Sequence, residues 1–224
     1  LLSFVPSIKP SNIVSIPLAA GKLPAISKST DLKMKRENFK NFLFYVGGAD
    51  PRKGLVHLVE SFEDVWKKHP SAQLILAGKE ITDSRVSEAV KLFAAKEKSS
   101  RPNNIHLLGF VTDEELAWLY KNAAAFVFPS RYEGFGLPLL EAMQAGCPTI
   151  TYNNSSLSEV ASDAAIVLED GVSMAPSICA LLSSKHIRDS LKQKGKKQAA
   201  QFSWKKTAER TLNVLEQAAK EKKT

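Results

Sequence analysis

Long apolar runs and cysteine are both scarce in this sequence of 224 residues. No apolar stretch approaches the roughly 18 to 20 residues that cross a bilayer. The two cysteines, Cys147 and Cys179, have neither metal-ligand spacing nor a disulfide pattern. The four histidines are scattered, with no pair at metal or triad spacing. These absences argue against a membrane-spanning chain, a disulfide-stabilised domain and a metal centre, and they favour a reducing, cytoplasmic setting.

The first residues also lack two common signals. The chain opens LLSFVPSIKPSN, without an initiator methionine and without a basic segment followed by an apolar stretch and a cleavage site. We therefore expect a piece of a longer protein, and no signal peptide. With 44% hydrophobic and 24% charged residues, the composition is that of a globular protein with one large domain, or one domain and an appended segment.

Acidic residues are scarce near the carboxyl end. Residues 1–184 carry 19 basic and 19 acidic residues, whereas residues 185–224 carry 12 basic and 4 acidic ones, which accounts for the net charge of +8. A basic helical end of this kind is either a solvated tail or an attachment to an anionic membrane surface. Nucleic acid is disfavoured, because no binding motif is present and only Phe202 and Trp204 interrupt the basic stretch.

Short apolar runs alternate with longer amphipathic segments along most of the chain. Amphipathic patterns predict helices over 55–70 and 84–98, and the capping box of Thr112 and Glu115 predicts the start of another. Continuous apolar strands separated by helices are typical of parallel sheets that are covered on both faces. The sequence therefore predicts an α/β fold, a doubly wound Rossmann-like parallel sheet of six strands, at 41–47, 72–78, 105–110, 124–130, 149–152 and 165–168.

We divide the chain into three parts on this pattern. Residues 1–40 are rich in Pro, Ser and Lys, without strong periodicity, and we expect an entry or linker segment there. Residues 41–184 form the expected Rossmann-like domain. Residues 185–224 are expected to form basic helices that pack on this domain or extend from it. Ligands of open α/β sheets bind beyond the carboxyl ends of the strands, so the loops at these ends are the place to search.

The loop after the first strand reads VGGADPRKG. Gly47 and Gly48 allow the backbone to approach a ligand closely, and Arg52 and Lys53 stand just before the next helix. Backbone amides, a helix N-terminus and two cations favour a phosphate or a diphosphate. The loop matches neither GxGxxG nor the Walker pattern. A surface turn with solvated charges is the alternative, and these residues alone leave both interpretations open.

The loop after the fourth strand reads RYEGFGLPLLEAMQAGCPTI. Pro138 suits the first turn of a helix, Gly146 suits the position after its last turn, and Pro148 ends it. These signals predict a helix over 137–145.

Two carboxylates belong to this element. Glu133 is expected in the loop and Glu141 on the helix, with backbone amides directed toward the same crevice from Phe135, Gly136 and Leu137. Amide donors for a phosphate, flanked by two acceptors for hydroxyl groups, fit a polyhydroxylated, phosphorylated ligand. Two solvated glutamates at a loop are the alternative.

The stretch EGFGLPLLE resembles the E-x₇-E signature of retaining glycosyltransferases of family 4, in the second domain of the GT-B fold. The resemblance covers roughly residues 40–200, because FLFYVGGADPRKGLVHLVESF, LILAG, IHLLGFVTDEELAWLYKNAAAFVFPS and SSLSEVASDAAIVLED occur in the family's order. NIVSIPLAAG resembles the segment that leads into this domain. YVGGADPRKG is similar to mannosyltransferases of surface polysaccharide assembly.

The resemblance implies a role for each candidate residue. Arg52 and Lys53 would hold the diphosphate of a sugar nucleotide and stabilise its departing charge, and Glu133 would accept from hydroxyls of the donor sugar. Glu141 would accept from the ribose. Backbone groups would complete the donor site at Gly47, Gly48, Gly109, Phe110, Val111, Phe135, Gly136 and Leu137, with the base against residues 109–111.

One position departs from the family pattern. Many members have Arg directly after the first glycine and Lys five positions later, whereas here Gly48 occupies that Arg position and Arg52 immediately precedes Lys53. Arg52 would replace the missing cation from the other end of the loop.

The implied function is transfer of a hexose, with retention, from a nucleotide diphosphate sugar to a glycan or lipid-linked acceptor. GDP-mannose is slightly preferred over UDP-sugars, and no metal or other cofactor is required. The acceptor would bind through an N-terminal domain that this chain lacks, so the piece alone is expected to be inactive. The whole enzyme would work in the cytoplasm, with peripheral contact at the inner face of the membrane. A non-catalytic nucleotide-binding module with the same fold is the alternative.

Overall fold

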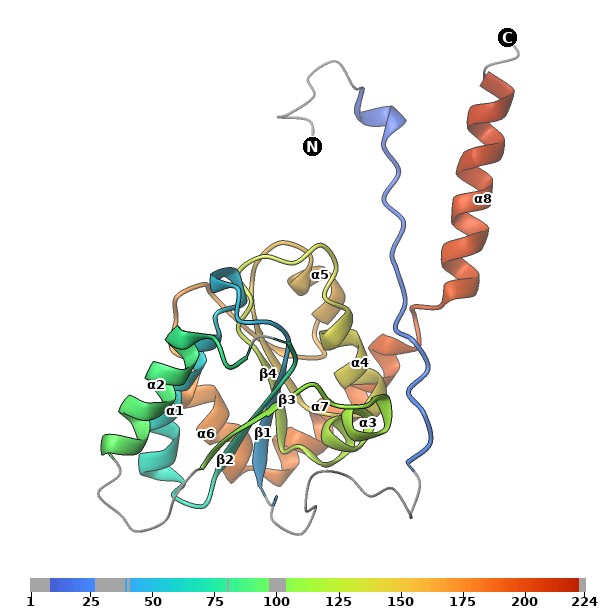
Figure 1. Cartoon of the computed structure of the whole chain (residues 1–224). Helices are drawn as coiled ribbons and strands as arrows, with labels where there is room; N and C mark the ends of the chain where they lie inside the picture. Colours follow the sequence, from blue (N-terminus) through green and yellow to red (C-terminus); the bar gives the residue numbers. More distant parts are fainter. Residues whose placement is uncertain (1–8, 27–38, 40, 80, 97–103, 222–224) are drawn as a thin grey trace.

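A computed structural model describes residues 9–26, 39, 41–79, 81–96 and 104–221. A parallel sheet of six strands lies in the middle of the molecule, with helices on both faces (Figure 1). The strands are β1 (Phe42–Val46), β2 (Gln73–Ala77), β3 (Ile105–Gly109), β4 (Ala125–Phe128), β5 (Thr149–Tyr152) and β6 (Ile166–Leu168). The α-helices are α1 (Leu55–Lys68), α2 (Ser84–Lys96), α3 (Asp113–Asn122), α4 (Leu137–Ala145), α5 (Leu157–Ala161), α6 (Ala175–Ser183), α7 (Lys185–Ala199) and α8 (Trp204–Glu221).

The strand order fixes where a ligand can bind. The order across the sheet is β3-β2-β1-β4-β5-β6, so the chain runs outward from β1 to β3 and then returns to place β4 on the other side of β1. Phe44 of β1 is paired with Ile75 of β2 and with Phe126 of β4. The connections diverge between β1 and β4, and a crevice opens beyond the carboxyl ends of strands at such a point. The predicted doubly wound α/β fold is confirmed.

The core explains why the apolar runs form strands. Phe42, Leu43, Phe44 and Tyr45 of β1 are all buried, because helices cover both faces of the sheet. Figure 1 places α1, α2 and α6 over one face, and α3, α4 and α5 over the other. Phe44 packs edge-on against Tyr120 with 5.3 Å between ring centroids, which ties α3 to the sheet.

The predicted boundaries are close to the observed ones. Thr112 and Glu115 form the capping box that opens α3, and Gly146 closes α4 with a φ of 74°. Strands β1 and β4 are shorter at both ends than the predicted runs. Strand β4 stops before Pro129, because proline has no amide hydrogen to donate to a neighbouring strand. The last residues of the helix expected over 84–98 lie outside the described part of the chain.

The two carboxyl-terminal helices differ in how they contact the rest of the domain. Helix α7 packs on α4 and α6 through the buried stripe of Leu191, Gly195 and Ala199, and Gly195 brings its backbone close to Met143. Helix α8 extends away from the sheet (Figure 1). Thr207 of α8 donates a hydrogen bond to the carbonyl of Pro17 at 2.7 Å, which joins the helix to the amino-terminal segment. None of the described helices combines the length and the apolar character of a membrane span.

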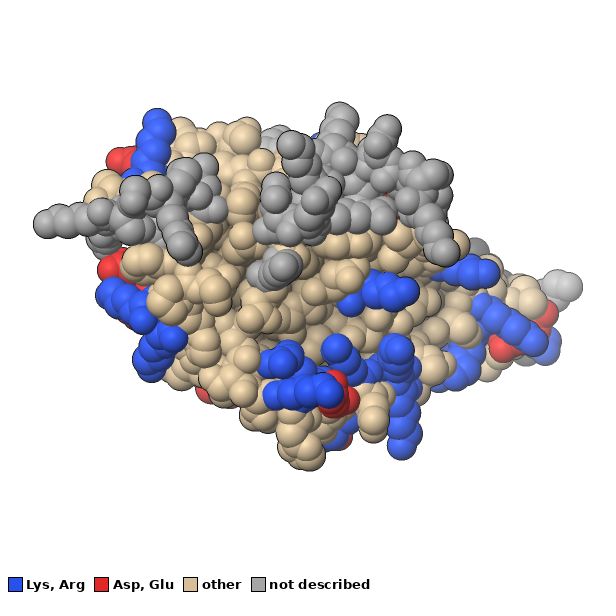
Figure 2. Space-filling model, turned by 90° about the horizontal axis from the view of Figure 1, so that it is seen from below, with Lys and Arg blue, Asp and Glu red and all other residues tan. Residues whose placement is uncertain are grey.

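Charge is unevenly distributed over the surface. Lys and Arg gather on the face seen from below, with few Asp or Glu among them (Figure 2). Helix α7, on the lower side of Figure 1, carries one acidic residue, Asp189, and six basic ones: Lys185, Arg188, Lys192, Lys194, Lys196 and Lys197. The basic excess predicted for the carboxyl end therefore begins on a helix that is packed against the domain.

Candidate functional site

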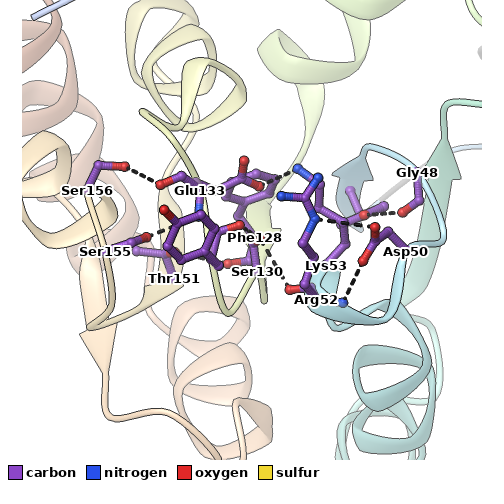
Figure 3. A network of polar contacts seen from close by, with 12 residues as sticks. Gly48, Asp50, Arg52, Lys53, Phe128, Ser130, Glu133, Thr151, Ser155 and Ser156 are labelled. Carbon is purple, nitrogen blue, oxygen red and sulfur yellow. Dashed lines mark hydrogen bonds and ion pairs between the residues drawn. The ribbon is translucent and has the colours of Figure 1, made fainter. Parts of the chain in front are cut away.

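Three loops meet beyond the carboxyl ends of the central strands (Figure 3). The first follows β1 and contains the short 3₁₀ helix η3 (Pro51–Lys53), the second joins β4 to α4, and the third joins β5 to α5. All three start at the same edge of the sheet, near the point where the connections of β1 and β4 diverge, so the strand order brings their side chains together. Several of the residues singled out in the sequence belong to these loops.

The first loop is shaped by its neighbours. The carboxylate of Asp50 accepts from the amide of Arg52 at 2.9 Å, which begins η3. Gly54 ends it with a φ of 68°, and a Cβ at this position would lie 2.2 Å from the carbonyl oxygen of Pro129. Only glycine allows the two backbones to approach so closely. The contact holds Lys53 over the loop that follows β4.

Lys53 and Glu133 form an ion pair at the centre of the site. The Lys53 Nζ lies 2.6 Å from Glu133 Oε1, and the side chains are only 20% and 11% exposed. The ammonium also lies 5.9 Å from the centre of the Phe128 ring. A charge-assisted bond this short and this well shielded is stronger than an ordinary surface ion pair. The two residues predicted to bind phosphate and sugar are therefore in direct contact.

Arg52 has a different partner. Its Nε lies 3.3 Å from Asp50 Oδ2, and both side chains are about half exposed. The hydrogen bond from the Arg52 amide, with smaller contributions from the charges of Arg52 and Lys53, lowers the pKa of the Asp50 carboxyl. The structure thus does not bring the Arg52 guanidinium and Lys53 together on Glu133. The carbonyl of Arg52 accepts from the amide of Arg131 at 2.7 Å, so its backbone is joined to the second loop.

Glu141 projects from α4 and is backed by α3. Its Oε2 accepts from the hydroxyl of Tyr120 at 3.1 Å. Burial raises the pKa of the Glu141 carboxyl, the nearby charge of Asp113 adds to this rise, and the hydrogen bond from Tyr120 opposes it. Burial and the charge of Glu141 also raise the pKa of Tyr120, so this phenol remains a donor. The arrangement leaves one carboxylate oxygen for a further donor, such as a hydroxyl group.

The start of α4 provides backbone donors. Gly136 precedes the helix with a φ of 94°, and a Cβ there would meet Leu157 of α5 at 2.6 Å. Since Gly136 has no side chain that could cap the first turn, an external acceptor can bind the amide of Leu137. The Phe135 ring packs on Phe202, with 5.9 Å between centroids, so only its backbone is offered to the site.

Three glycines line the other edge of the crevice. Gly47 and Gly78 directly follow β1 and β2, Gly109 is the last residue of β3, and the Gly78 amide donates to the carbonyl of Gly109 at 2.8 Å. A Cβ on Gly78 would lie 2.0 Å from the carbonyl oxygen of Gly47. The hydroxyl of Tyr45 donates to the carbonyl of Gly48 at 2.8 Å and holds that peptide in place.

The predicted base-binding residues differ in exposure. Phe110 is 74% exposed, whereas Val111 packs against the core. They follow Gly109 at the end of β3, and strands β2 and β1 lie between β3 and β4 in the sheet.

Four residues of the site were not predicted from the sequence. Ser155 and Ser156 bind the backbone of Glu133, and Tyr120 donates a hydrogen bond to Glu141. Gly78 allows the backbone of Gly47 to approach closely. Gly78 has a recognisable signal, a glycine directly after an apolar strand. The two serines and the tyrosine have none, because each acts on a residue 21 or more positions away. In the described part of the chain, no group of three His, Cys, Asp or Glu side chains could hold a metal ion.

Comparison with known proteins places this chain in a family. The chain matches the family described as Glycosyl transferases group 1 over residues 29–203. The chain belongs to this family. The O-antigen chain mannosyltransferase B of Escherichia coli is 35% identical over 182 residues, which are 79% of this chain and 46% of that protein. The capsular polysaccharide biosynthesis glycosyltransferase CapM of Staphylococcus aureus is 28% identical over 169 residues, which are 74% of this chain and 42% of CapM.

Two solved structures share the fold. A TarM variant of S. aureus, crystallised with UDP, fondaparinux and a GlcNAc-glycerol, has a TM-score of 0.76 at 19% identity and covers 95% of this chain and 41% of its own. HepE of Anabaena, solved with UDP and glucose, has a TM-score of 0.68 at 17% identity and covers 79% of this chain and 48% of its own. The expected resemblance to one half of a GT-B glycosyltransferase is confirmed. The chain spans less than half the length of these group 1 glycosyltransferases and structural neighbours.

Proposed function

We propose that this chain is the donor-binding half of a retaining hexosyltransferase. The observation that carries the proposal is the contact between Lys53 and Glu133 at the point where the connections of β1 and β4 diverge. A cation for a phosphate and a carboxylate for hydroxyl groups stand side by side there, and Glu141 lies on the helix that follows. A nucleotide diphosphate sugar has the groups that these side chains bind.

Each part of such a donor has a partner. The diphosphate binds Lys53, the amide of Leu137 and the backbone near Gly47 and Gly48. The donor hexose binds Glu133, and the ribose hydroxyls bind the free oxygen of Glu141. The base lies along the backbone of residues 109–111.

The reaction separates charge as the hexose leaves the diphosphate. Lys53 and the amides of the loops stabilise the negative charge on the leaving group, which is the largest electrostatic demand of this step. Removal of one such donor typically costs about 3 kcal/mol of transition-state stabilisation. Arg52 reaches the same phosphate only by leaving Asp50, so we assign it a supporting role. We propose that these groups suffice without a metal ion.

The relatives favour one donor over others. The O-antigen chain enzyme is named a mannosyltransferase, which supports a preference for GDP-mannose over UDP-sugars. UDP is bound in two structural neighbours, so UDP-sugars stay as alternatives to be tested. A glycan or a lipid-linked acceptor would bind a second, N-terminal domain. The chain alone should therefore bind donor weakly and turn over little of it.

Titration calorimetry of the 224-residue chain with GDP and UDP tests the donor site. We expect binding to weaken about tenfold or more in Lys53→Ala, which removes the phosphate cation, and in Glu141→Ala, which removes the ribose acceptor. Equal affinity in the wild type and both variants would remove the site. Transfer by an enzyme completed with its second domain separates a glycosyltransferase from a non-catalytic nucleotide-binding module.

The basic face of α7 supports a contact with the cytoplasmic surface of a membrane. Its six cations, offset by a single acidic residue, can attract anionic lipid headgroups at about 1 kcal/mol per cation near the surface. Sedimentation with vesicles that contain phosphatidylglycerol should decrease as salt is raised. Equal sedimentation with purely zwitterionic vesicles would contradict an electrostatic contact.

A further inference from the structure

We propose that Ser155 and Ser156 are positioning residues that hold Glu133 in place for the donor hexose, so that Lys53 is the group that moves when a donor binds. This inference rests on the proposed function. It assigns a role to two residues of the loop between β5 and α5, which take no part in the donor contacts described above.

The two serines bind both backbone polar groups of one residue, Glu133. The amide of Glu133 donates to Ser155 Oγ at 3.1 Å, and the hydroxyl of Ser156 donates to the carbonyl of Glu133 at 3.1 Å (Figure 3). A loop residue held at its N–H and at its C=O cannot rotate about its backbone without losing one of these bonds. The direction in which the Glu133 side chain leaves the backbone is therefore set by a neighbouring loop.

Ser155 occupies a conformation that serine rarely adopts. Its φ is +44°, in the left-handed region, which costs a residue other than glycine of order 1–3 kcal/mol. Glycine would adopt this conformation without strain but has no hydroxyl to accept from Glu133. Strain of this kind persists where the surrounding contacts require it, and the bond from Glu133 is the contact that a glycine would lose.

Ser156 also departs from its usual use. It is the residue before α5, where a serine side chain normally caps the helix by accepting from an amide of the first turn. Here the side chain makes no such capping bond, and its hydroxyl goes to Glu133 instead. Both serines thus bind the second loop, and Ser156 does so in place of capping its own helix.

Further hydrogen bonds fasten these serines to the site. The hydroxyl of Ser155 donates to Asn154 Oδ1 at 3.3 Å, and Asn154 Nδ2 donates to the carbonyl of Ser130 at 2.9 Å. Ser130 is fully buried, and its hydroxyl lies within hydrogen-bond distance of the Arg52 carbonyl. The loops after β1, β4 and β5 are therefore joined by one chain of bonds.

The consequence concerns how a donor enters the site. Lys53 Nζ is bound to Glu133, so a diphosphate must draw the ammonium toward itself. A lysine side chain has four flexible bonds, whereas Glu133 has a shorter side chain on a backbone that is held at its N–H and at its C=O. As Lys53 turns to the phosphate, the Glu133 carboxylate stays in place and becomes available to hydroxyls of the hexose. The serines thereby separate the binding of phosphate from the recognition of sugar.

Calorimetry on the 224-residue chain tests this with two probe pairs, GDP with GDP-mannose and UDP with UDP-glucose. We compare a ratio of two dissociation constants, that of the nucleotide divided by that of the nucleotide sugar. The ratio is measured for the pair that the wild type binds. We expect Ser155→Gly and Ser156→Ala each to lower this ratio about 3- to 10-fold, the range for one lost hydrogen bond. The affinity for the nucleotide without sugar should stay within about twofold, because Lys53 is untouched.

Two controls separate positioning from folding. Ser156→Thr keeps the hydroxyl and should restore the ratio. Ser162→Gly relieves a second serine with positive φ, at +48°, at the opposite end of α5, and should leave both affinities unchanged. The melting temperature of Ser155→Gly should not fall, so a lower ratio in this variant cannot come from unfolding.

The possible results have distinct meanings. A wild type that binds neither nucleotide nor nucleotide sugar would overturn the proposed function, and the present inference with it. A wild type that binds the nucleotide, combined with an unchanged ratio in both serine variants, would overturn only the positioning role. Equal losses for the probes with and without sugar would also overturn it, since that pattern indicates a general structural defect. A wild-type ratio of about one would show that Glu133 does not bind the sugar.

Discussion

The ion pair of Lys53 and Glu133 gives a quantitative prediction for the free protein. The two side chains are 20% and 11% exposed. The contribution of the pair to the free energy of unfolding therefore lies between that of an exposed ion pair and that of a fully buried one. Exposed pairs contribute roughly 0.2–1 kcal/mol, and removal of one partner from a fully buried pair costs roughly 3–5 kcal/mol. We expect Lys53→Met and Glu133→Gln each to lower the free energy of unfolding by about 2 kcal/mol. Each variant leaves a shielded charge without its counter-charge.

The double variant should be less damaged than the two single variants together. Once Lys53 is Met, the Glu133 carboxylate has already lost its partner, so Glu133→Gln then removes an unpaired charge and costs little. We expect a coupling free energy of about 1–2 kcal/mol from the double-mutant cycle. Urea unfolding followed by circular dichroism measures all four proteins. Each single variant should also melt lower by about 4–8 °C for a chain of this size.

The pair of Lys194 and Asp163 is a matched control. Its atoms are 2.9 Å apart, but the side chains are 48% and 76% exposed. The same cycle at this pair should give about 0.5 kcal/mol or less. A coupling at Lys53 and Glu133 no larger than at the control would refute the reasoning, because it would mean that the two charges are not shielded from water.

Four further results are expected. Glu133→Gln should bind GDP or UDP several-fold more tightly in calorimetry, because Lys53 no longer has to leave a carboxylate, and weaker binding would contradict this order of events. Glu141→Gln should raise the free energy of unfolding at pH 7, because burial raises the pKa of this carboxyl above its ordinary 4.5 and so penalises its ionised form in the folded state. This gain in stability should vanish as the pH falls below 4.5, where the carboxyl is protonated in both the folded and the unfolded state. Gly54→Ala should destabilise the chain by about 2 kcal/mol or more in urea unfolding, since its Cβ would lie 2.2 Å from the Pro129 carbonyl oxygen. Cys147 should react with a thiol reagent only on unfolding, because burial raises the pKa of its thiol to about 12, and rapid modification of the native protein would contradict its burial.

The parallel sheet could be predicted because its signals are local. The apolar runs are continuous where helices cover both faces, as in β1, whose first four residues are buried. Thr112 with Glu115, and Gly146 after α4, mark helix ends through bonds that span only a few residues. The strand order was not readable from the sequence, because it depends on which strands pair, and every strand is similarly apolar.

The site was predictable as a set of loops but not as a set of contacts. The carboxyl ends of parallel strands lie at one edge, so Lys53 and Glu133 could be placed there from the sequence. Their direct contact could not, because it joins side chains 80 residues apart. The role of Ser155 and Ser156 could not be predicted for a further reason. A serine pair before a short helix is normally a turn and a cap, and only the fold shows that its hydroxyls are directed to another loop.

Three features of this site cost stability in the free protein. Glu141 is a carboxylate under a burial penalty, Ser155 is held with a positive φ, and Ser156 leaves the start of α5 without its side-chain cap. Replacing the first by Gln or the second by Gly should stabilise the fold, whereas a residue chosen only for folding would not be expected to behave in this way. The two substitutions should weaken different parts of donor binding, the nucleotide for Glu141 and the sugar for Ser155. A gain in stability joined to a selective loss in binding is therefore the signature that separates a functional site from an ordinary arrangement of loops.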